Sequence, residues 1–240
     1  MKKIGVIAAL PDEAACLTQQ PLQQLVPINI NEDTCICLSG IGHNNALHAA
    51  AELIKQDCQA LISWGVAGGL NESLHSGDVI VADKIISNDI TIECHANWQE
   101  QLLIHLSSAE YRVVNGSIYS NTAICASAKA KNKLHLKTGA DAVDMESAAI
   151  AGLAKEMNLE FVAIRTIADE AIASIPPAVK RHTNELGKPK PIRFLLSCLF
   201  NPMQIASLIL LARAFSKAMN TMKIIAPDLK DRRFLYNTPT

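Results

Sequence analysis

The chain has 240 residues, of which 49% are hydrophobic and only 19% are charged, and its formal net charge is −1. This composition excludes a disordered chain and predicts one domain with a large core, part of which we expect to form a homo-oligomer interface. A net charge near zero gives no long-range field for nucleic acid, so we expect no nucleic-acid partner. The seven cysteines lie mostly in apolar runs, which indicates reduced thiols and a cytoplasmic protein.

The N-terminal part of the sequence predicts alternating strands and helices. The apolar run KKIGVIAAL, which Pro11 ends, predicts a first strand rather than a signal peptide, and DEAACLTQQ is compatible with a helix. The run DTCICL predicts a second strand, followed by a glycine turn in SGIGHNNA and an amphipathic helix. The run CQALISWGVAGGL predicts a third strand that ends in a second glycine turn, at Gly65, Gly68 and Gly69.

The middle of the chain continues this alternation. The segments GDVIVADKIISNDI and RVVNGSIYSN predict two more strands. The stretch 142–171 then predicts a strand at 142–145, a helix at 146–157, a turn at Asn158 and a strand at 161–167. Because the strands are apolar throughout, both faces of the sheet must be covered. We therefore expect a single-domain, three-layer α/β fold with a mixed, mostly parallel central sheet flanked by helices.

The C-terminal part differs in composition. Residues 174–223 predict a Pro-containing lid and then a helical hairpin made of the apolar segments RFLLSCLF and MQIASLILLARAFSKAMNTM, each too short to span a bilayer. The excess of lysine and arginine between residues 180 and 223 is compatible with peripheral contact with an anionic membrane surface, or with a solvated basic face. We expect the domain to span residues 1–226, with a tail at 227–240.

Three carboxylates, Glu13, Glu146 and Asp169, fall at the ends of predicted strands. Any one of them could simply cap a helix. Ligands of α/β sheets bind at the carboxyl ends of strands, however, and carboxylates in different environments suit cleavage of a glycosidic bond. We expect the helix dipole to keep Glu146 ionised, and a less polar loop to raise the pKa of Asp169.

Several motifs occur in a fixed order: IGVIAALPDE, SGIGHNNA, WGVAGGLNESLHSGDVIVAD, VDMESAAIA and IRTIADEA. From residue 1 to about residue 172 the chain resembles the nucleoside phosphorylase and nucleosidase superfamily, in particular the methylthioadenosine/S-adenosylhomocysteine nucleosidases. The last third of the chain is more similar to the hopanoid-associated branch, whose members are thought to remove adenine from adenosylhopane. The resemblance implies a phosphorylase-like fold and a small-molecule purine nucleoside as the partner.

The resemblance also implies a chemical role for each of the three carboxylates. Asp169 stands at the place of the general acid that protonates N7 of the purine, and Glu13 at the place of the base that orients the attacking water. Glu146 would bind the 2′- and 3′-hydroxyls of the ribose, with Met145 packing on the sugar. Arg165 falls at an arginine that the nucleosidases share, although a salt bridge to a neighbouring carboxylate explains it equally well.

The remaining positions implied by the resemblance are apolar. Ile124 and Cys125 occupy the segment that contacts the purine, and Ile41 and Leu10 would line the sugar and its 5′ side. Ser63 and Val66 stand around the second glycine turn, at the positions where the phosphorylases of the superfamily hold phosphate with an arginine and a serine. The backbone N–H groups from Gly65 to Gly69 could still bind an anion. Water is therefore favoured as the acceptor, with inorganic phosphate as the alternative co-substrate.

Two further features bear on the site. Ala168 stands where many relatives have a serine, so that Asp169 could be held by the backbone alone. We expect no metal and no organic cofactor, because neither the histidines nor the pair Cys35 and Cys37 has a partner at metal-ligand spacing.

The leading hypothesis is an enzyme that releases adenine from a 5′-substituted adenosine, with adenosylhopane as the expected substrate. Methylthioadenosine/S-adenosylhomocysteine nucleosidase and purine nucleoside phosphorylase activities are the nearest alternatives. A nicotinamide-dependent oxidoreductase is disfavoured because IGVIAALPDE lacks the G-x-G-x-x-G pattern. A non-catalytic, nucleoside-binding subunit of a lipid-synthesis assembly remains a third hypothesis, suggested by the apolar C-terminal segments.

Overall fold

The computed structural model describes residues 2–88, 90–108, 110–175 and 203–230. The strands are β1 (Ile4–Ala8), β2 (Ile28–Asn29), β3 (Thr34–Leu38), β4 (Ala60–Gly69), β5 (Val79–Ser87), β6 (Ile90–Glu93), β7 (Val113–Ser120), β8 (Ala142–Asp144) and β9 (Glu160–Asp169). The helices are α1 (Pro11–Ala15), α2 (His43–Ile54), α3 (Ala96–His105), α4 (Ala128–Thr138), α5 (Ser147–Glu156) and α8 (Met203–Lys230).

All of these strands belong to one sheet, in the order β2-β3-β1-β4-β8-β7-β5-β6, and β9 pairs with both β4 and β5. The strands β4, β8, β7, β5 and β9 therefore close into a ring, which β1 and β3 extend on one side. Pairing is parallel within β3-β1-β4-β9 and within β5-β7-β8, but antiparallel where the two sets meet. The mixed, mostly parallel α/β sheet is confirmed, whereas the closed ring was not predicted.

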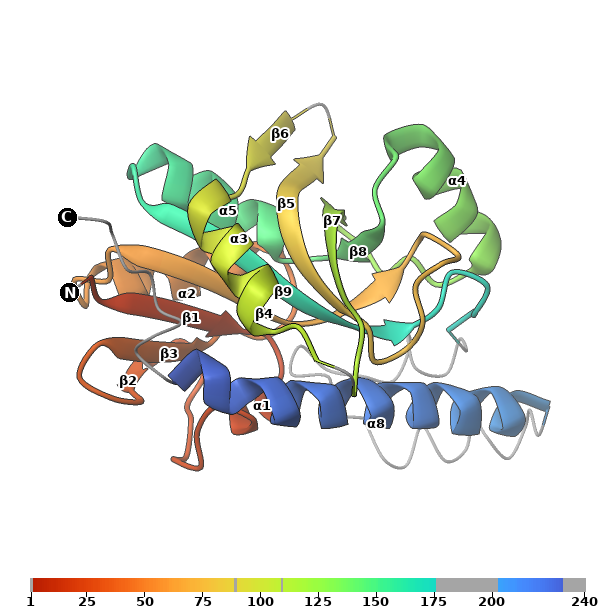
Figure 1. The fold of residues 1–240 in the computed structure, drawn as a ribbon, viewed down its shortest axis with the longest axis horizontal. Coiled ribbons are helices and arrows are strands. Elements are labelled where there is room, and N and C mark those ends of the chain that lie inside the picture. Colours follow the sequence, from red (N-terminus) through yellow and green to blue (C-terminus); the bar gives the residue numbers. More distant parts are fainter. Residues whose placement is uncertain (1, 89, 109, 176–202, 231–240) are drawn as a thin grey trace.

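Two hydrophobic cores lie on opposite faces of the sheet. Ile7 and Cys37 pack with residues of α2 and α5, whereas Val6 and Ile36 pack with residues of α1, α3 and α8. This division follows from the alternation of side chains along a strand, so that the apolar runs supply both cores at once. Figure 1 shows α8 as one long helix along the lower side of the molecule, with α4 set apart from the other helices.

The stretch 142–171 forms the predicted strand, helix, turn and strand. The turn includes Asn158, whose φ is 54°, as the sequence predicted. One detail was wrong: Asp169 is the last residue of β9 and not part of a loop. The strand continues because residues 160–169 pair with β4 along its whole length, across a bulge at Ala67 and Gly68.

The last helix extends past the predicted start of the tail. We expected the domain to span residues 1–226 and a tail to follow. The helix α8 instead runs through Pro227 to Lys230, since Ala226 and Leu229 are buried in the core on either side of the proline. No described helix is long and apolar enough to cross a membrane. Most of the predicted lid and the first hairpin segment, RFLLSCLF, lie outside the described residues.

Candidate active site

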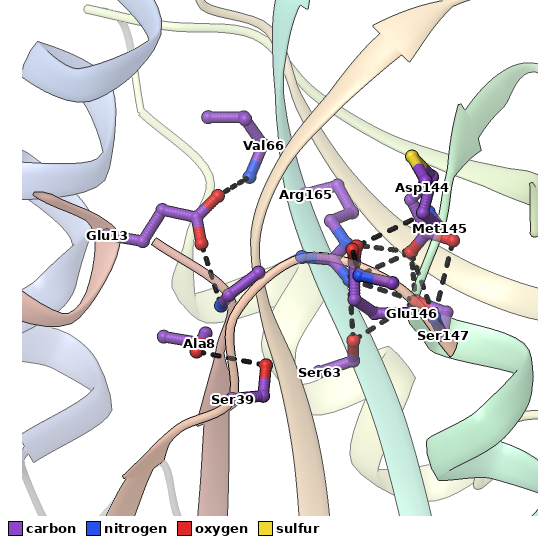
Figure 2. Close-up of polar contacts among 12 residues, drawn as sticks. Ala8, Glu13, Ser39, Ser63, Val66, Asp144, Met145, Glu146, Ser147 and Arg165 are labelled. Carbon is purple, nitrogen blue, oxygen red and sulfur yellow. Dashed lines mark hydrogen bonds and ion pairs between the residues drawn. The ribbon is translucent and has the colours of Figure 1, made fainter. Parts of the chain in front are cut away.

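Arg165, in the middle of β9, is the centre of a buried charged cluster (Figure 2). Its side chain is only 2% exposed, and Nη2 lies 2.8 Å from Oδ2 of Asp144 and 3.8 Å from Oε2 of Glu146. The guanidinium also donates to the hydroxyl of Ser63, at 2.7 Å. A buried guanidinium requires such partners, because leaving either charge unpaired in the interior costs several kcal/mol. Of the two predicted explanations for Arg165, the structure contains the salt bridge.

Glu13 lies on the other side of Arg165 and is held by backbone donors. Its Oε2 accepts from the N–H groups of Ala9 and Leu10, at 3.0 and 2.8 Å, and its Oε1 accepts from Val66 at 2.9 Å. Burial raises the pKa of Glu13, although Arg165 and the three N–H groups oppose that effect. A buried carboxylate with a raised pKa is well suited to take a proton from water.

Glu146 is the N-cap of α5, and its carboxylate points back toward Arg165 rather than capping its own helix. Oε1 accepts from the N–H of Gly42, at 2.8 Å, which joins the turn after β3 to the end of β8. Burial and the neighbouring Asp144 raise the pKa of Glu146 to about 7, although Arg165 and the Gly42 N–H oppose them. The expectation that the helix dipole keeps Glu146 ionised was therefore wrong, because burial outweighs the dipole.

Asp169 lies farther along the same pair of strands and has a charged partner of its own. Burial raises the pKa of its carboxyl group, and the ammonium of Lys131 opposes this effect. The Nζ atom of Lys131 donates to Oδ2 of Asp169. Lys131 was not predicted from the sequence, which left the backbone as the possible support of Asp169. No local signal distinguishes Lys131 from the other lysines of α4, such as Lys129 and Lys133, which are exposed.

Two glycines of β4 make room for these side chains. A Cβ atom on Gly65 would lie 2.6 Å from Oε1 of Glu13 and closer still to Nη1 of Arg165, and one on Gly68 would lie 3.4 Å from the carboxylate of Asp169. Three residues of a strand span about 10 Å. The cluster around Arg165 and the carboxylate of Asp169 are thus spaced along one strand by a distance comparable to a nucleoside.

The prediction of a second glycine turn was wrong. Gly65, Gly68 and Gly69 lie within β4 rather than in a turn after it. A Cβ on Gly65 would collide with Arg165 and Glu13, and one on Gly68 would approach the carboxylate of Asp169, whereas one on Gly69 would lie 3.4 Å from the backbone oxygen of Asp169. The N–H of Val66, within this segment, already donates to Glu13. An anion site at the strand therefore stays a prediction.

The six residues predicted to make apolar contacts are all half-buried. All six side chains are neither fully buried nor fully exposed, in contrast to the buried Glu13, Glu146 and Arg165. Val66 lies within β4, and the other five residues follow the ends of β1, β3, β7 and β8: Leu10, Ile41, Ile124, Cys125 and Met145. The roles of these residues toward a ligand stay predictions.

A cavity of about 580 Å³ opens elsewhere, between the start of β5, the segment before β7 and α8. It is lined by Asp78, Arg112 and Lys217 among others, and by none of the predicted site residues. We place the site at the Arg165 cluster instead, because buried charges there are costly unless they serve a purpose. Among the described residues, no group of three or more His, Cys, Asp or Glu side chains is arranged to hold a metal ion.

Comparison with known proteins decides the family. The model of a family described as "Phosphorylase superfamily" matches residues 3–185, which is most of the chain. The chain belongs to the phosphorylase superfamily. It is therefore an enzyme of the nucleosidase and phosphorylase kind, which cleaves N-glycosidic bonds.

Relatives in the phosphorylase superfamily are similar over most of their length. The chain is 28% identical to the 5′-methylthioadenosine/S-adenosylhomocysteine nucleosidase of Shewanella oneidensis, covering 70% of this chain and 84% of the relative. It is 25% identical to the nucleosidase of the same name from Mycobacterium bovis, covering 77% and 92%.

Solved structures of the superfamily share the fold. The Helicobacter pylori nucleosidase of that name, bound to butyl-thio-DADMe-Immucillin-A, has a TM-score of 0.66 at 17% identity, covering 95% of this chain and 99% of the other. The futalosine hydrolase of Helicobacter pylori has a TM-score of 0.64 at 19% identity, covering 92% and 97%. The phosphorylase-like fold is confirmed by these structures.

The raised pKa of Glu146 predicts a pH-dependent stability. In the folded state Glu146 holds its proton up to a pKa of about 7, against an ordinary 4.5, so the folded state binds more protons between these values. Stability is therefore lost as the pH rises from 4.5 through 7, by about 3 kcal/mol for this group. We expect Glu146→Gln to be about as stable as wild type at pH 4.5, but more stable by up to that amount at pH 8.

Urea unfolding of both proteins at pH 4.5 and pH 8 measures this difference. Glu156→Gln, at an exposed position of the same helix, serves as the control and should follow wild type at both values. If the free energies of unfolding of Glu146→Gln and wild type changed equally between the two pH values, the raised pKa of Glu146 would be contradicted.

The close packing at Gly65 predicts a second stability effect. In Gly65→Ala the new methyl group collides with Glu13 and Arg165, neither of which can move without breaking its hydrogen bonds. We expect a loss of about 1–3 kcal/mol in the free energy of unfolding. Gly152→Ala, in α5, is the control, because a Cβ there meets no atom within 4 Å, and it should stabilise by about 0.5–1 kcal/mol. Equal effects of the two substitutions would refute this account.

Proposed function

We propose that the enzyme hydrolyses the N-glycosidic bond of a purine nucleoside and releases adenine from a 5′-substituted adenosine. The observation that carries this proposal is the spacing along β4. The cluster of Glu13, Glu146 and Arg165 lies near Gly65, and Asp169 lies near Gly68. The cluster near Gly65 can bind the ribose and activate water, while Asp169 near Gly68 contacts the purine.

The division of labour follows from the environments of the side chains. Asp169 protonates N7 of the purine, so that the base leaves as a neutral molecule. Glu146 accepts hydrogen bonds from the ribose hydroxyls, and the negative charge around Arg165 stabilises the positive charge that develops on the sugar. Glu13 takes the proton of the attacking water. Relatives named for action on 5′-methylthioadenosine and S-adenosylhomocysteine support a purine nucleoside with a 5′ substituent.

Water is the proposed acceptor rather than phosphate. Val66 offers no polar side chain, and its N–H donates to Glu13. The hydroxyl of Ser63 is engaged with Arg165 and Ser147. These neighbours leave few donors in this part of β4 for a phosphate ion.

We further propose that the 5′ substituent is large and apolar, as in adenosylhopane. The resemblance of the last third to the hopanoid-associated branch supports this identity. Ile209 and Leu210 of α8 are 48% and 64% exposed, and provide apolar surface of the kind such a substituent needs.

The experiment measures adenine released by the purified enzyme from methylthioadenosine, S-adenosylhomocysteine and adenosylhopane, each with and without phosphate. We expect adenine from at least one of them, a free sugar as the second product, and no acceleration by phosphate. A preference of at least tenfold in kcat/KM for adenosylhopane would support the finer assignment, and a preference for methylthioadenosine would overturn it. Formation of a sugar phosphate would replace hydrolysis with phosphorolysis, and no adenine from any substrate would overturn the proposed function.

A further inference from the structure

Lys131 is the only buried residue of α4, an eleven-residue helix that is otherwise half-buried or exposed. Its side chain is 0% exposed. A helix that packs for stability alone usually turns apolar residues inward, since a buried ammonium must regain by pairing what it loses in hydration. The inward residue of α4 is therefore better explained by its charge than by its volume.

The ammonium of Lys131 is directed at the end of β9. Nζ donates to Oδ2 of Asp169 and to the carbonyl oxygen of Glu170, the latter at 2.7 Å. Two acceptors from consecutive residues fix the position of Nζ relative to the strand. The carboxylate of Asp169 is in turn fixed in direction by a donor from α4, a helix outside the sheet.

The start of α4 is tied to the segment that follows Asp169. The N–H of Ala128 donates to Oγ of Ser174 at 3.2 Å, and the N–H of Ile175 donates to the carbonyl of Ala126 at 2.8 Å. These bonds link the helix that carries Lys131 to the chain that carries its partner. The ion pair is thus anchored from both sides.

The other groups that face the pair are few among the described residues. Cys125, before α4, is close enough to feel both charges, and burial raises the pKa of its thiol. The carboxylate of Glu170 accepts instead from the N–H of Ser76 and lies 3.7 Å from His75. Gly68 of β4 contributes no side chain. Lys131 is therefore the nearest source of a proton for Asp169 among these groups.

We propose that Lys131 is the positioning residue of Asp169, and that the pair carries one proton which Asp169 passes to the departing purine; this inference rests on the proposed function. In the resting enzyme the proton is on Nζ and Asp169 is ionised. As the C1′–N9 bond breaks, its electron pair stays with the purine, the proton moves from Nζ to Oδ2 and from Oδ2 to N7. Water adds to C1′ and gives a proton to Glu13, which returns through solvent to the neutral amine of Lys131.

Lys131→Met tests this role by its pH profile. We expect kcat to fall about 100-fold and KM to change less than threefold, because a general acid contributes to the transition state. The basic limb of the kcat profile should move to lower pH, since the last proton of the pair would then be held by a carboxyl group alone. Lys133→Met, exposed on the same helix, should match wild type in both respects.

Lys131→Arg separates charge from proton transfer. Arginine keeps the positive charge beside Asp169 but does not release its proton. We expect kcat to stay at least tenfold below wild type, with the basic limb still displaced. Full recovery of kcat in Lys131→Arg would overturn the shared proton and leave a purely electrostatic contact.

A double-mutant cycle with Asp169→Asn shows whether Lys131 acts through Asp169. The double variant should have the kcat of Asp169→Asn within twofold, because the partner through which Lys131 works is already absent. Independent, multiplying losses would overturn the proposal. If wild type cleaves no nucleoside, the proposed function fails, and the melting temperatures still test the pair. Each single variant should then melt lower than wild type and the double variant should recover part of the loss, whereas additive losses would show that the two side chains are not coupled.

Discussion

Asp169→Asn is expected to lower kcat for adenine release by about 10²–10⁴-fold while changing KM little. Asparagine has nearly the shape of aspartic acid but no acidic proton, so the purine would have to leave as an anion. Burial raises the pKa of Asp169 while Lys131 opposes this effect, and in the proposed mechanism Asp169 passes to N7 the proton that it shares with Lys131. Steady-state kinetics across pH 5–9, with adenine measured by chromatography, gives the ratio directly.

Glu170→Gln is the matched control for Asp169→Asn. Glu170 follows Asp169 in the chain, but its side-chain carboxylate is 36% exposed and is engaged with His75. We expect its kcat to remain within about threefold of wild type. Retention of full turnover by Asp169→Asn would remove the general acid from the proposed mechanism. The melting temperature of each variant should be measured beside the kinetics, because Asp169 is also the ionic partner of Lys131.

Arg165→Met is expected to lower the free energy of unfolding by about 3–5 kcal/mol. Methionine fills a similar volume but leaves Asp144, Glu146 and Glu13 without the cation that faces all three. At neutral pH these carboxylates must then take up protons or admit water, and either response destabilises the native state. Urea unfolding at pH 7.5 measures the loss.

The control for Arg165→Met is Arg112→Met, since Arg112 is 52% exposed and faces Asp78 at 3.8 Å. Its loss should stay below about 1 kcal/mol, as for other surface ion pairs. Arg165→Lys should fall between the two arginine variants, because lysine keeps the charge but lacks the separate nitrogens with which the guanidinium donates to Asp144 and Ser63. A loss of less than about 1 kcal/mol for Arg165→Met would contradict a charged cluster that depends on this arginine.

Secondary structure was predicted well wherever the pattern was local. The apolar runs gave β1, β3 and β4, and the stretch 142–171 gave β8, α5 and β9 within a few residues. The errors came where a distant contact overrides local preference. We expected a tail from residue 227, but α8 continues to Lys230, with Ala226 and Leu229 buried in the core. The glycines after residue 64 predicted a turn, but pairing with β9 keeps them in a strand.

The sequence supplied candidate residues for the site but not the way in which their charges are paired. Glu13, Glu146 and Asp169 were selected by their positions after strands and by resemblance to a family. Those positions do not show which carboxylates share a positively charged partner. Two of them face Arg165, whereas Asp169 pairs with Lys131. The ionisation of Glu146 was predicted in the wrong direction, because the sequence shows the helix start but not the burial.

By itself the sequence determined the alternation of strands and helices, the two apolar faces of the sheet and the identities of the acidic residues, because periodicity and motif order are properties of neighbouring positions. The tertiary structure decided which charges meet. Gly42 and Glu146 are 104 residues apart, Ser63 and Arg165 are 102 apart, and Lys131 and Asp169 are 38 apart. Contacts over such separations arise from strand pairing: Ser63 and Arg165 lie on the paired strands β4 and β9, while Gly42 and Glu146 follow β3 and β8 of the same sheet. Because these pairings join segments far apart in the chain, no pattern of neighbouring positions encodes them.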